Sequence, residues 1–323
     1  MRFRDKISLP LRIMLARIKR SKIPLLISWE VTRRCNYRCA YCDIWKDNLP
    51  ELSTDQILSI IGGLSSCGTR AISFVGGEPL LRDDIGDIIL FARKKNIYVK
   101  LTSNGSLVNS KIDLLKMVDL IKITLNGPRQ IHDPQRQQGS YDQVIQAIHL
   151  LKKEKINVGL NAVISKQNLK YIDFILNIAQ ENDIKATFQP LEPRMKDNSN
   201  IIEYFPDEKE YKETLTYLIE KKKKGVKALG NSLDGLIYLY NWPHKKNLRC
   251  WAGIFHFRID YKGDIYACDR LTHNKSFNCL EVGIKEAIKN IDVVNCQNSC
   301  WRNSTIEVNN LLSLKPRAIF NSA

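Results

Sequence analysis

Near its N-terminus the chain reads LLISWEVTRRCNYRCAYC over residues 25–42. The first seven residues form an apolar run that is typical of a buried parallel strand. Three cysteines follow it, and the spacing of Cys35, Cys39 and Cys42 lets three thiolates converge on one iron-sulfur cube whose fourth iron keeps no protein ligand. Zinc would need a fourth tetrahedral ligand, and the neighbouring Asp43 is a poor partner for three thiolates. The loop therefore predicts an open cluster directly after the first strand.

Five more apolar runs repeat the strand pattern downstream, and amphipathic segments separate them. One such segment places Ile85, Ile88 and Ile89 on a single helix face, and Ser53 with Gln56 forms the capping-box pattern of a helix start. This alternation predicts an α/β fold, a partial (β/α)6 TIM-like barrel, whose chemistry lies at the carboxyl ends of the strands. The expected strands lie at residues 25–31, 71–75, 98–101, 121–125, 158–164 and 186–188.

We expect three regions along the chain. Residues 1–24 are a basic amphipathic segment, residues 25–225 are the barrel, and residues 226–323 are a small cysteine-rich β-hairpin extension. In the first region Leu11, Met14, Leu15 and Ile18 follow helical spacing after a proline. We favour packing of this apolar stripe on the protein's own body, and contact with an acidic lipid surface is the alternative.

The composition of the 323 residues excludes several classes of protein. Hydrophobic residues make up 44% and charged residues 26% of the chain, so disorder is not its main state. No apolar run reaches the roughly 18 residues of a membrane span, and no signal peptide is recognisable, so we expect a cytoplasmic protein with peripheral contact to the inner membrane surface as an option. Nine cysteines in such a compartment indicate metal ligands or reactive thiols rather than disulfides.

Polar motifs follow the next strands in order. Gly76-Gly77-Glu78-Pro79 combines glycines, which let the backbone approach a ligand closely, with a carboxylate that can pair with an ammonium group. Small polar side chains follow the third and fourth strands, and an arginine, whose planar fork suits a carboxylate, comes further on. These later candidates are Ser103, Asn104, Thr124, Asn126 and Arg136.

Together with the three cysteines, these motifs resemble those of the radical S-adenosylmethionine (SAM) superfamily. The resemblance implies that Cys35, Cys39 and Cys42 ligate a 4Fe-4S cluster and that an aromatic, Tyr41, precedes the last ligand. It further implies a SAM site built from the residues of the later motifs. In the family pattern an acid stands where this chain has Asn126, so a charge-dependent role at that position does not carry over. The implied SAM-binding residues are Tyr41, Gly76, Gly77, Glu78, Pro79, Ser103, Asn104, Thr124, Asn126 and Arg136.

The C-terminal region carries its own cysteines. Residues 255–260 and 264–267 flank a turn at Gly263 and predict a β-hairpin that brings Cys250 and Cys268 together. Cys296 and Cys300 complete a four-thiolate set. The layout resembles the SPASM and Twitch extensions of radical SAM enzymes, which implies one auxiliary 4Fe-4S cluster used for electron transfer. A structural zinc on the same four cysteines is the alternative. Cys279 could replace one of the four ligands, but we do not offer it as a ligand.

The resemblance implies an enzyme that cleaves SAM reductively and abstracts hydrogen from a substrate, with an electron donor such as flavodoxin or ferredoxin as partner. The substrate is a small molecule or a peptide, and the basic N-terminus keeps a membrane lipid open. A general base would be required, and Glu192, Asp234 and Asp260 are candidates without an assignment.

Two competing hypotheses belong to other classes. The net charge of +16 suits an RNA-modifying radical enzyme, yet the basic residues are dispersed and no RNA-binding module is recognisable, so we do not expect nucleic acid as a partner. The other hypothesis is a zinc-binding scaffold without catalysis.

Overall fold

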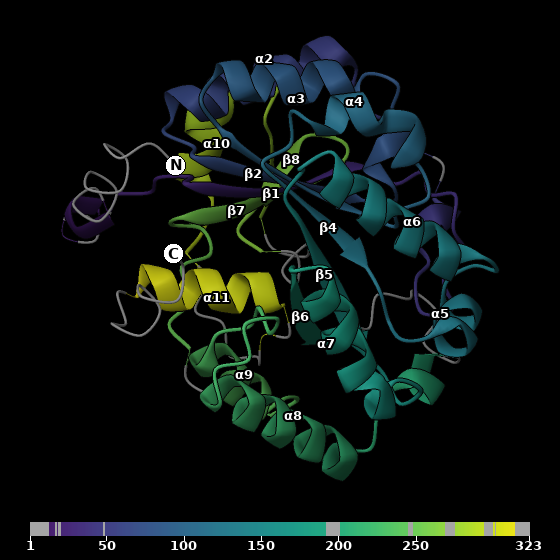
Figure 1. Ribbon diagram of the computed structural model, residues 1–323. Helices are drawn as coiled ribbons and strands as arrows, with labels where there is room; N and C mark the ends of the chain where they lie inside the picture. Colours follow the sequence, from purple (N-terminus) through teal and green to yellow (C-terminus); the bar gives the residue numbers. More distant parts are fainter. Residues whose placement is uncertain are drawn as a thin grey trace.

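The computed structural model describes residues 13–16, 18, 21–47, 49–191, 201–244, 248–268, 275–293, 300 and 302–313. Its centre is one sheet with the strand order β6-β5-β4-β3-β2-β1-β7-β8-β9, in which β1 to β6 are parallel. Because the first and last strands of this order do not pair, the sheet forms an open, partial barrel, as the sequence predicts (Figure 1). The strands are β1 Leu26–Thr32, β2 Ala71–Gly76, β3 Tyr98–Ser103, β4 Leu120–Thr124, β5 Val158–Ile164, β6 Lys185–Pro190, β7 His256–Ile259, β8 Asp264–Tyr266 and β9 Phe277–Asn278.

Helices cover the outer face of the sheet, and Figure 1 shows them following one another around it. The predicted capping box is confirmed, because Gln56 N donates to Ser53 Oγ at 3.3 Å and Ser53 N donates to Gln56 Oε1 at 2.9 Å. The helices are α2 Thr54–Ser66, α3 Ile85–Lys94, α4 Ile112–Leu115, α5 Arg129–Gln135, α6 Ser140–Lys153, α7 Ile172–Glu181, α8 Glu208–Lys223, α9 Leu233–Leu239, α10 Ile284–Asn290 and α11 Asn303–Leu312.

The two faces of the sheet differ in polarity because successive strand residues point to opposite sides. On β3, Val99 and Leu101 are fully buried toward the helices, whereas Lys100 and Thr102 line a cavity on the inner face. The same alternation on β4 buries Ile121 and Ile123. The apolar core therefore lies between sheet and outer helices, and the inside of the barrel is polar.

The expected C-terminal hairpin is confirmed as β7 and β8, which pair antiparallel around the turn at Gly263. The hairpin is not a separate extension, because β7 also pairs in parallel with β1 and extends the barrel sheet. A buried ion pair between Glu30 of β1 and Arg258 of β7 joins the two strands. The division into residues 25–225 and 226–323 stays a prediction, and the sheet runs without a break across it.

The prediction for the N-terminal stripe is wrong in its residues. Ile13 and Ala16 are the buried ones and pack in a cluster with Trp251, Phe255 and Leu312. Met14, Leu15 and Ile18 are instead exposed, at 46%, 43% and 71%, and Leu11 lies outside the described residues. Ile13 and Ala16 are three residues apart, so they also share one helix face. This buried face lies about one residue away from the face that the sequence predicted.

Within the described part of the chain, no helix combines the length and the apolar character that crossing a membrane requires.

Candidate functional site

A cavity of about 440 Å³ lies on the inner face of the sheet and reaches the loops after the strands. All three cysteines of the first motif line it, together with Gly76, Gly77 and Arg136. The opposite wall comes from β7 and from the N-terminal half of α11. Segments separated by more than 200 residues in sequence thus surround one space.

The cysteine loop is fixed by hydrogen bonds from its own backbone. Ala40 N donates to Gln135 O at 3.0 Å, and Cys42 N donates to Cys39 O at 3.1 Å. Burial raises the pKa of the Cys35 thiol to about 11, so a metal that binds there must displace a proton. Among the described residues, no three Cys, His, Asp or Glu side chains are gathered closely enough for a single metal ion. A cube of several irons spreads its thiolates over separate metal atoms.

Gly76, the last residue of β2, and Gly77 bring the backbone against the segment that leads from β1 to the cysteines. Gly76 has φ +144°, and a Cβ at Gly76 would stand 2.1 Å from Thr32 O. A Cβ at Gly77 would stand 2.1 Å from Arg34 O. Only glycine allows this approach, which leaves room for a ligand on the other side of the loop.

Glu78 does not line the cavity, contrary to the expectation that its carboxylate pairs with a ligand's ammonium group. The side chain is fully buried behind the loop, and it accepts hydrogen bonds from Leu80 N at 3.1 Å, Ser103 Oγ at 3.0 Å and Asn104 N at 2.7 Å. Burial raises the pKa of this carboxyl to about 7. Pro79, which is buried at the start of a 3-10 turn, also stays outside the lining. Glu78 therefore ties the β2 loop to the β3 loop.

Ser103 and Asn104 do face the cavity, as predicted. Asn104 Nδ2 donates to Asn36 Oδ1 at 2.9 Å, which connects the loop after β3 with the cysteine loop. Ser106 N donates to Asn104 Oδ1 at 2.9 Å and holds the amide in this orientation. Asn36 is a contact that the sequence motifs did not single out.

Asn126 is fully buried behind the cavity wall and does not line the cavity. Its Nδ2 donates to Tyr41 OH at 2.6 Å and to Gln135 Oε1 at 3.0 Å, while its Oδ1 accepts from Val163 N at 3.1 Å. Tyr41 and Thr124 do line the cavity. An amide meets all three of these partners, whereas a carboxylate has no N–H to donate, which accounts for asparagine at this position.

Arg136 provides the test of whether the residues fit a bound cofactor. Its Nη1 donates to Tyr41 OH at 3.3 Å, but its buried Nε has no hydrogen-bond partner within the described residues. Burial lowers the pKa of this guanidinium, but the nearby Cys39, Cys42 and Tyr41 and the hydrogen bond to Tyr41 together raise it more, so the group stays cationic. A half-buried cation whose buried Nε still has a donor to offer, beside three thiols, fits a ligand that brings a carboxylate.

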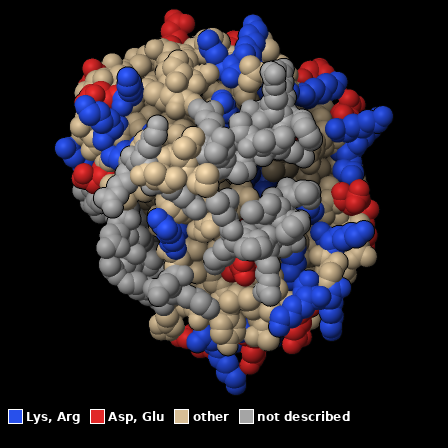
Figure 2. Space-filling model, turned by 90° about the vertical axis from the view of Figure 1, so that its left-hand side faces the viewer, with Lys and Arg blue, Asp and Glu red and all other residues tan. Residues whose placement is uncertain are grey.

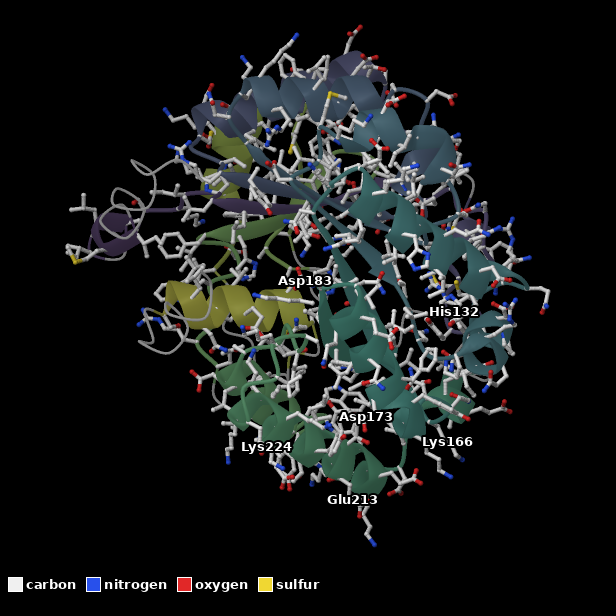
Figure 3. The ribbon with its side chains drawn as sticks, in the orientation of Figure 1. His132, Lys166, Asp173, Asp183, Glu213 and Lys224 are labelled. Atoms are coloured by element: carbon white, nitrogen blue, oxygen red, sulfur yellow. The ribbon has the colours of Figure 1, made fainter. Side chains whose placement is uncertain are left out.

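The two residues that precede Arg136 in its motif have structural roles. His132 is labelled in Figure 3 and lies in α5; its Nδ1 accepts from Asn126 N at 3.1 Å, and burial lowers its pKa to about 3. Asp133 accepts from Gly139 N at 2.9 Å and Tyr141 N at 2.8 Å and so fixes the turn into α6.

The sequence motifs missed the inward-pointing polar side chains of the strands. Lys100, Lys122, Gln189 and His256 all line the cavity, and so does Asn161, for which the sequence offered only its place on a strand. Period-two alternation was the signal that could have found them, because each stands opposite to a buried apolar neighbour. Of the candidate bases, Asp234 and Asp260 do not line the cavity, and Glu192 lies outside the described residues.

The second cysteine set is described in part. Gly253, three residues after Cys250, lies so close to two other segments that a Cβ there would stand 2.9 Å from Asp292 O and 3.2 Å from Ala267 Cβ. The chain around Cys250 therefore lies beside the residue that precedes Cys268. Cys296 and His273 lie outside the described residues, while Cys279 is buried in the main apolar core, where burial raises its pKa to about 12.

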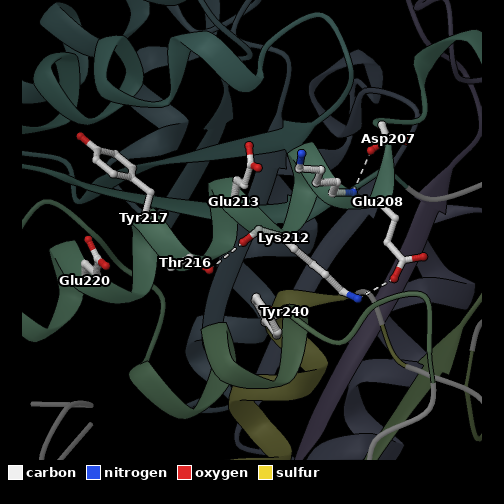
Figure 4. A pocket seen from close by; sticks show the side chains of 9 residues that line it. Asp207, Glu208, Lys212, Glu213, Thr216, Tyr217, Glu220 and Tyr240 are labelled. Carbon is white, nitrogen blue, oxygen red and sulfur yellow. Dashed lines mark hydrogen bonds and ion pairs between the residues drawn. The ribbon is translucent and has the colours of Figure 1, made fainter.

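A larger hollow of about 750 Å³ lies elsewhere, along the outer side of α8. Figure 4 shows its charged side chains, among them Lys212, which donates to Glu208 at 2.5 Å, and Glu213. No cysteine lines it, and its ion pairs are those of a solvated helix surface. In Figure 2, Lys and Arg alternate with Asp and Glu around the face shown, without a continuous basic stripe among its coloured residues.

Comparison with known proteins identifies the class of the barrel. Residues 29–179 match the family model of the Radical SAM superfamily, so this part of the chain is a radical SAM domain. The fold agrees with the crystal structure of Streptococcus suis SuiB bound to S-adenosylmethionine, with a TM-score of 0.69 at 17% identity over 85% of this chain and 68% of that one. At this identity the likeness concerns the fold alone.

Two curated relatives have named activities. The chain is 34% identical over 190 residues to the Fe-coproporphyrin III synthase of Methanosarcina barkeri, covering 56% of this chain and 46% of that protein. It is 27% identical over 262 residues to the mycofactocin maturase MftC of Mycolicibacterium smegmatis, covering 78% of this chain and 66% of that protein. The chain therefore spans less than two thirds of the length of either relative.

Proposed function

We propose that this protein is a radical SAM enzyme that uses Cys35, Cys39 and Cys42 to hold a 4Fe-4S cluster with one open iron. The observation that carries the proposal is the common cavity. Three thiols, the backbone of two closely packed glycines, and Arg136, whose buried Nε has no partner among the described residues, all face the same space. When bound there, the cluster supplies the electron that cleaves SAM reductively and so starts hydrogen abstraction from the substrate.

The residues around the cavity divide the work of binding SAM. Arg136 holds the carboxylate of the methionine part, and the backbone at Gly76 and Gly77 approaches its amino group. Ser103, Asn104 and Thr124 offer hydrogen bonds to the remainder of the ligand. Glu78 and Asn126 act from behind the wall, because each holds a loop or a side chain that lines it.

We further propose one auxiliary 4Fe-4S cluster on Cys250, Cys268, Cys296 and Cys300, as in a Twitch extension, with flavodoxin or ferredoxin as the electron donor. The neighbourhood of the Cys250 and Cys268 segments supports this arrangement. Four protein ligands would close the cluster to substrate, so it would pass electrons. The same four cysteines would also suit zinc, and metal analysis separates the two.

The substrate that we propose is a small molecule or a peptide. One curated relative is named a synthase of Fe-coproporphyrin III and the other a maturase of mycofactocin, so both kinds of product occur among the relatives. The exposed Met14, Leu15 and Ile18 on the basic N-terminal helix support peripheral contact with the inner membrane surface as a further proposal.

The test is iron, sulfide and 5′-deoxyadenosine analysis of anaerobically purified protein. Wild-type protein should hold at least four irons per chain and form 5′-deoxyadenosine from SAM under reducing conditions, and Cys39→Ala should abolish that product. Cys67→Ala is the matched control, because this cysteine caps α2 away from the cavity, and it should match wild type. Colourless wild-type protein with stoichiometric zinc would refute the proposal.

The auxiliary cluster needs a separate variant. Cys268→Ala should lower the iron content by up to about four atoms and stop product formation while some reductive cleavage of SAM continues. Undiminished product formation by this variant would remove the auxiliary cluster from the mechanism.

A further inference from the structure

The charge balance of the cavity is one-sided. Among its described lining residues are two lysines, Lys100 and Lys122, and two arginines, Arg136 and Arg302, but no aspartate or glutamate. Arg136 stands beside the cysteines at the carboxyl ends of the strands. The lysines belong to the strands themselves, on the inner face of β3 and β4, so they lie deeper in the barrel.

The two lysines are close enough in the sheet to act on one ligand. Lys122 is level with Thr102 in the register of β3 and β4, and Lys100 is one pleat lower on the neighbouring strand. With strands about 4.8 Å apart and two residues spanning about 7 Å, their Cα atoms are separated by about 8 Å. Two long lysine side chains can converge across that span.

The described residues leave the charge of this pair largely unbalanced. The Lys100 ammonium makes no hydrogen bond or ion pair with any described residue, whereas Lys122 Nζ donates to Thr187 Oγ1 at 2.6 Å. Glu307 is the carboxylate that acts on Lys122 from α11, but its Oε1 accepts from Ser232 N at 2.8 Å and it also faces Lys222.

Such an arrangement costs free energy in the absence of a partner. Burial lowers the pKa of Lys100, and burial together with the Lys100 charge lowers that of Lys122. An apolar residue in either position would remove this cost. The opposing charge therefore has a natural source in a ligand that occupies the cavity.

We propose that the substrate enters this cavity with an anionic group, a carboxylate or a phosphate, which Lys100 and Lys122 bind inside the barrel. The inference rests on the proposed function, because it takes the barrel interior as the substrate site. Lys100 and Lys122 each stand four residues before the loop residues Asn104 and Asn126, which places their Cα atoms about 13 Å below the loops. An anion held there directs the opposite end of its molecule toward the cysteines.

The experiment measures how anions protect individual lysines of the full-length wild-type protein from an amine-acylating reagent, read by peptide mass spectrometry. Inorganic phosphate and succinate are titrated separately, with sodium chloride at equal ionic strength as reference. We expect the acylation rates of Lys100 and Lys122 to fall at least about tenfold at saturation, with no change at Lys94, an exposed lysine on α3.

The two arms also distinguish the source of the anion. Protection by phosphate alone supports a phosphorylated substrate, protection by succinate alone a carboxylate, and protection by both a site for either group. Protection by neither beyond the chloride reference overturns the proposal. Because labelling needs neither SAM nor electrons, this result is independent of whether the protein forms 5′-deoxyadenosine.

Variants provide a second readout. Lys100→Met and Lys122→Met keep side-chain length and remove a charge from a half-buried position inside the barrel, so we expect both to fold. Each should weaken calorimetric binding of the protective anion at least about tenfold, which is the size of one charge-assisted hydrogen bond. Lys100→Arg should retain more binding than Lys100→Met, and Lys94→Met should bind as wild type. Unweakened binding by both methionine variants would refute the role of the pair.

Discussion

Replacing Gly77 by alanine should separate the two loops that carry the first two motifs. A Cβ at this position would stand 2.1 Å from Arg34 O and 2.6 Å from Arg34 C, both of them backbone atoms that no rotamer change can move away. Ordinary carbon–oxygen contacts begin at about 3.3 Å, so the loops must separate by about 1.2 Å. Cys35 directly follows Arg34 and would move with it.

The cost follows from the hydrogen bonds that now hold the loops together. Gly77 N donates to Thr32 O at 2.9 Å, and Glu78 N donates to Arg34 O at 2.8 Å. A separation of about 1.2 Å stretches both to about 4 Å, beyond hydrogen-bond range, and each is worth about 0.5–1.5 kcal/mol. We therefore expect Gly77→Ala to lower the free energy of unfolding by about 1–3 kcal/mol in urea titrations of the cluster-free protein, and to lower the iron content after reconstitution.

Gly86→Ala is the matched control for this substitution. Gly86 lies in α3, where a Cβ would meet only Leu114 Cβ at 3.9 Å, so alanine should stabilise the helix by about 0.5–1 kcal/mol. If Gly77→Ala unfolds like wild type and binds as much iron, the close approach of the loops is not what positions Cys35.

Further substitutions test three other contacts. Asn126→Leu leaves Val163 N–H and other buried partners without a hydrogen bond and should cost about 2–4 kcal/mol in urea unfolding. Glu30→Ala removes the carboxylate that pairs with the buried Arg258 and should lower the free energy of unfolding by about 3–5 kcal/mol. Replacing both residues by methionine should cost clearly less in the same assay. Burial raises the pKa of Glu78 to about 7, so ionisation of this carboxyl destabilises the folded state. Relative to Glu78→Gln, the free energy of unfolding of the wild type should fall by up to about 3 kcal/mol between pH 4.5 and 7. A parallel pH dependence of the two proteins would contradict this.

The sequence predicted the barrel well because its six parallel strands are local apolar runs, separated by amphipathic segments, and one of these segments begins with the capping box of Ser53 and Gln56. It also placed the cysteines, Gly77 and Arg136 at one edge of the sheet, since parallel strands end together. The direction of a side chain could not be predicted. Glu78 had the features of a ligand-binding acid, but it turns away from the cavity, because three donors from neighbouring loops meet behind the wall.

The parallel pairing of β7 with β1 was equally hidden, because it joins residues more than 200 positions apart and no local pattern encodes such a partner. The lysines of the barrel interior were missed for a different reason. Within a strand of four to six residues, one polar side chain does not interrupt an apolar run enough to stand out.

That long-range pairing also affects how the chain is made. Translation completes β1 through β6 well before residue 256 leaves the ribosome, and until then the free edge of β1 exposes unpaired N–H and C=O groups to other chains. Nascent protein thus passes through a stage prone to self-association, in which chaperones have their main opportunity to act. Fragments that end before His256 would keep the edge of β1 unpaired and would be the first to aggregate.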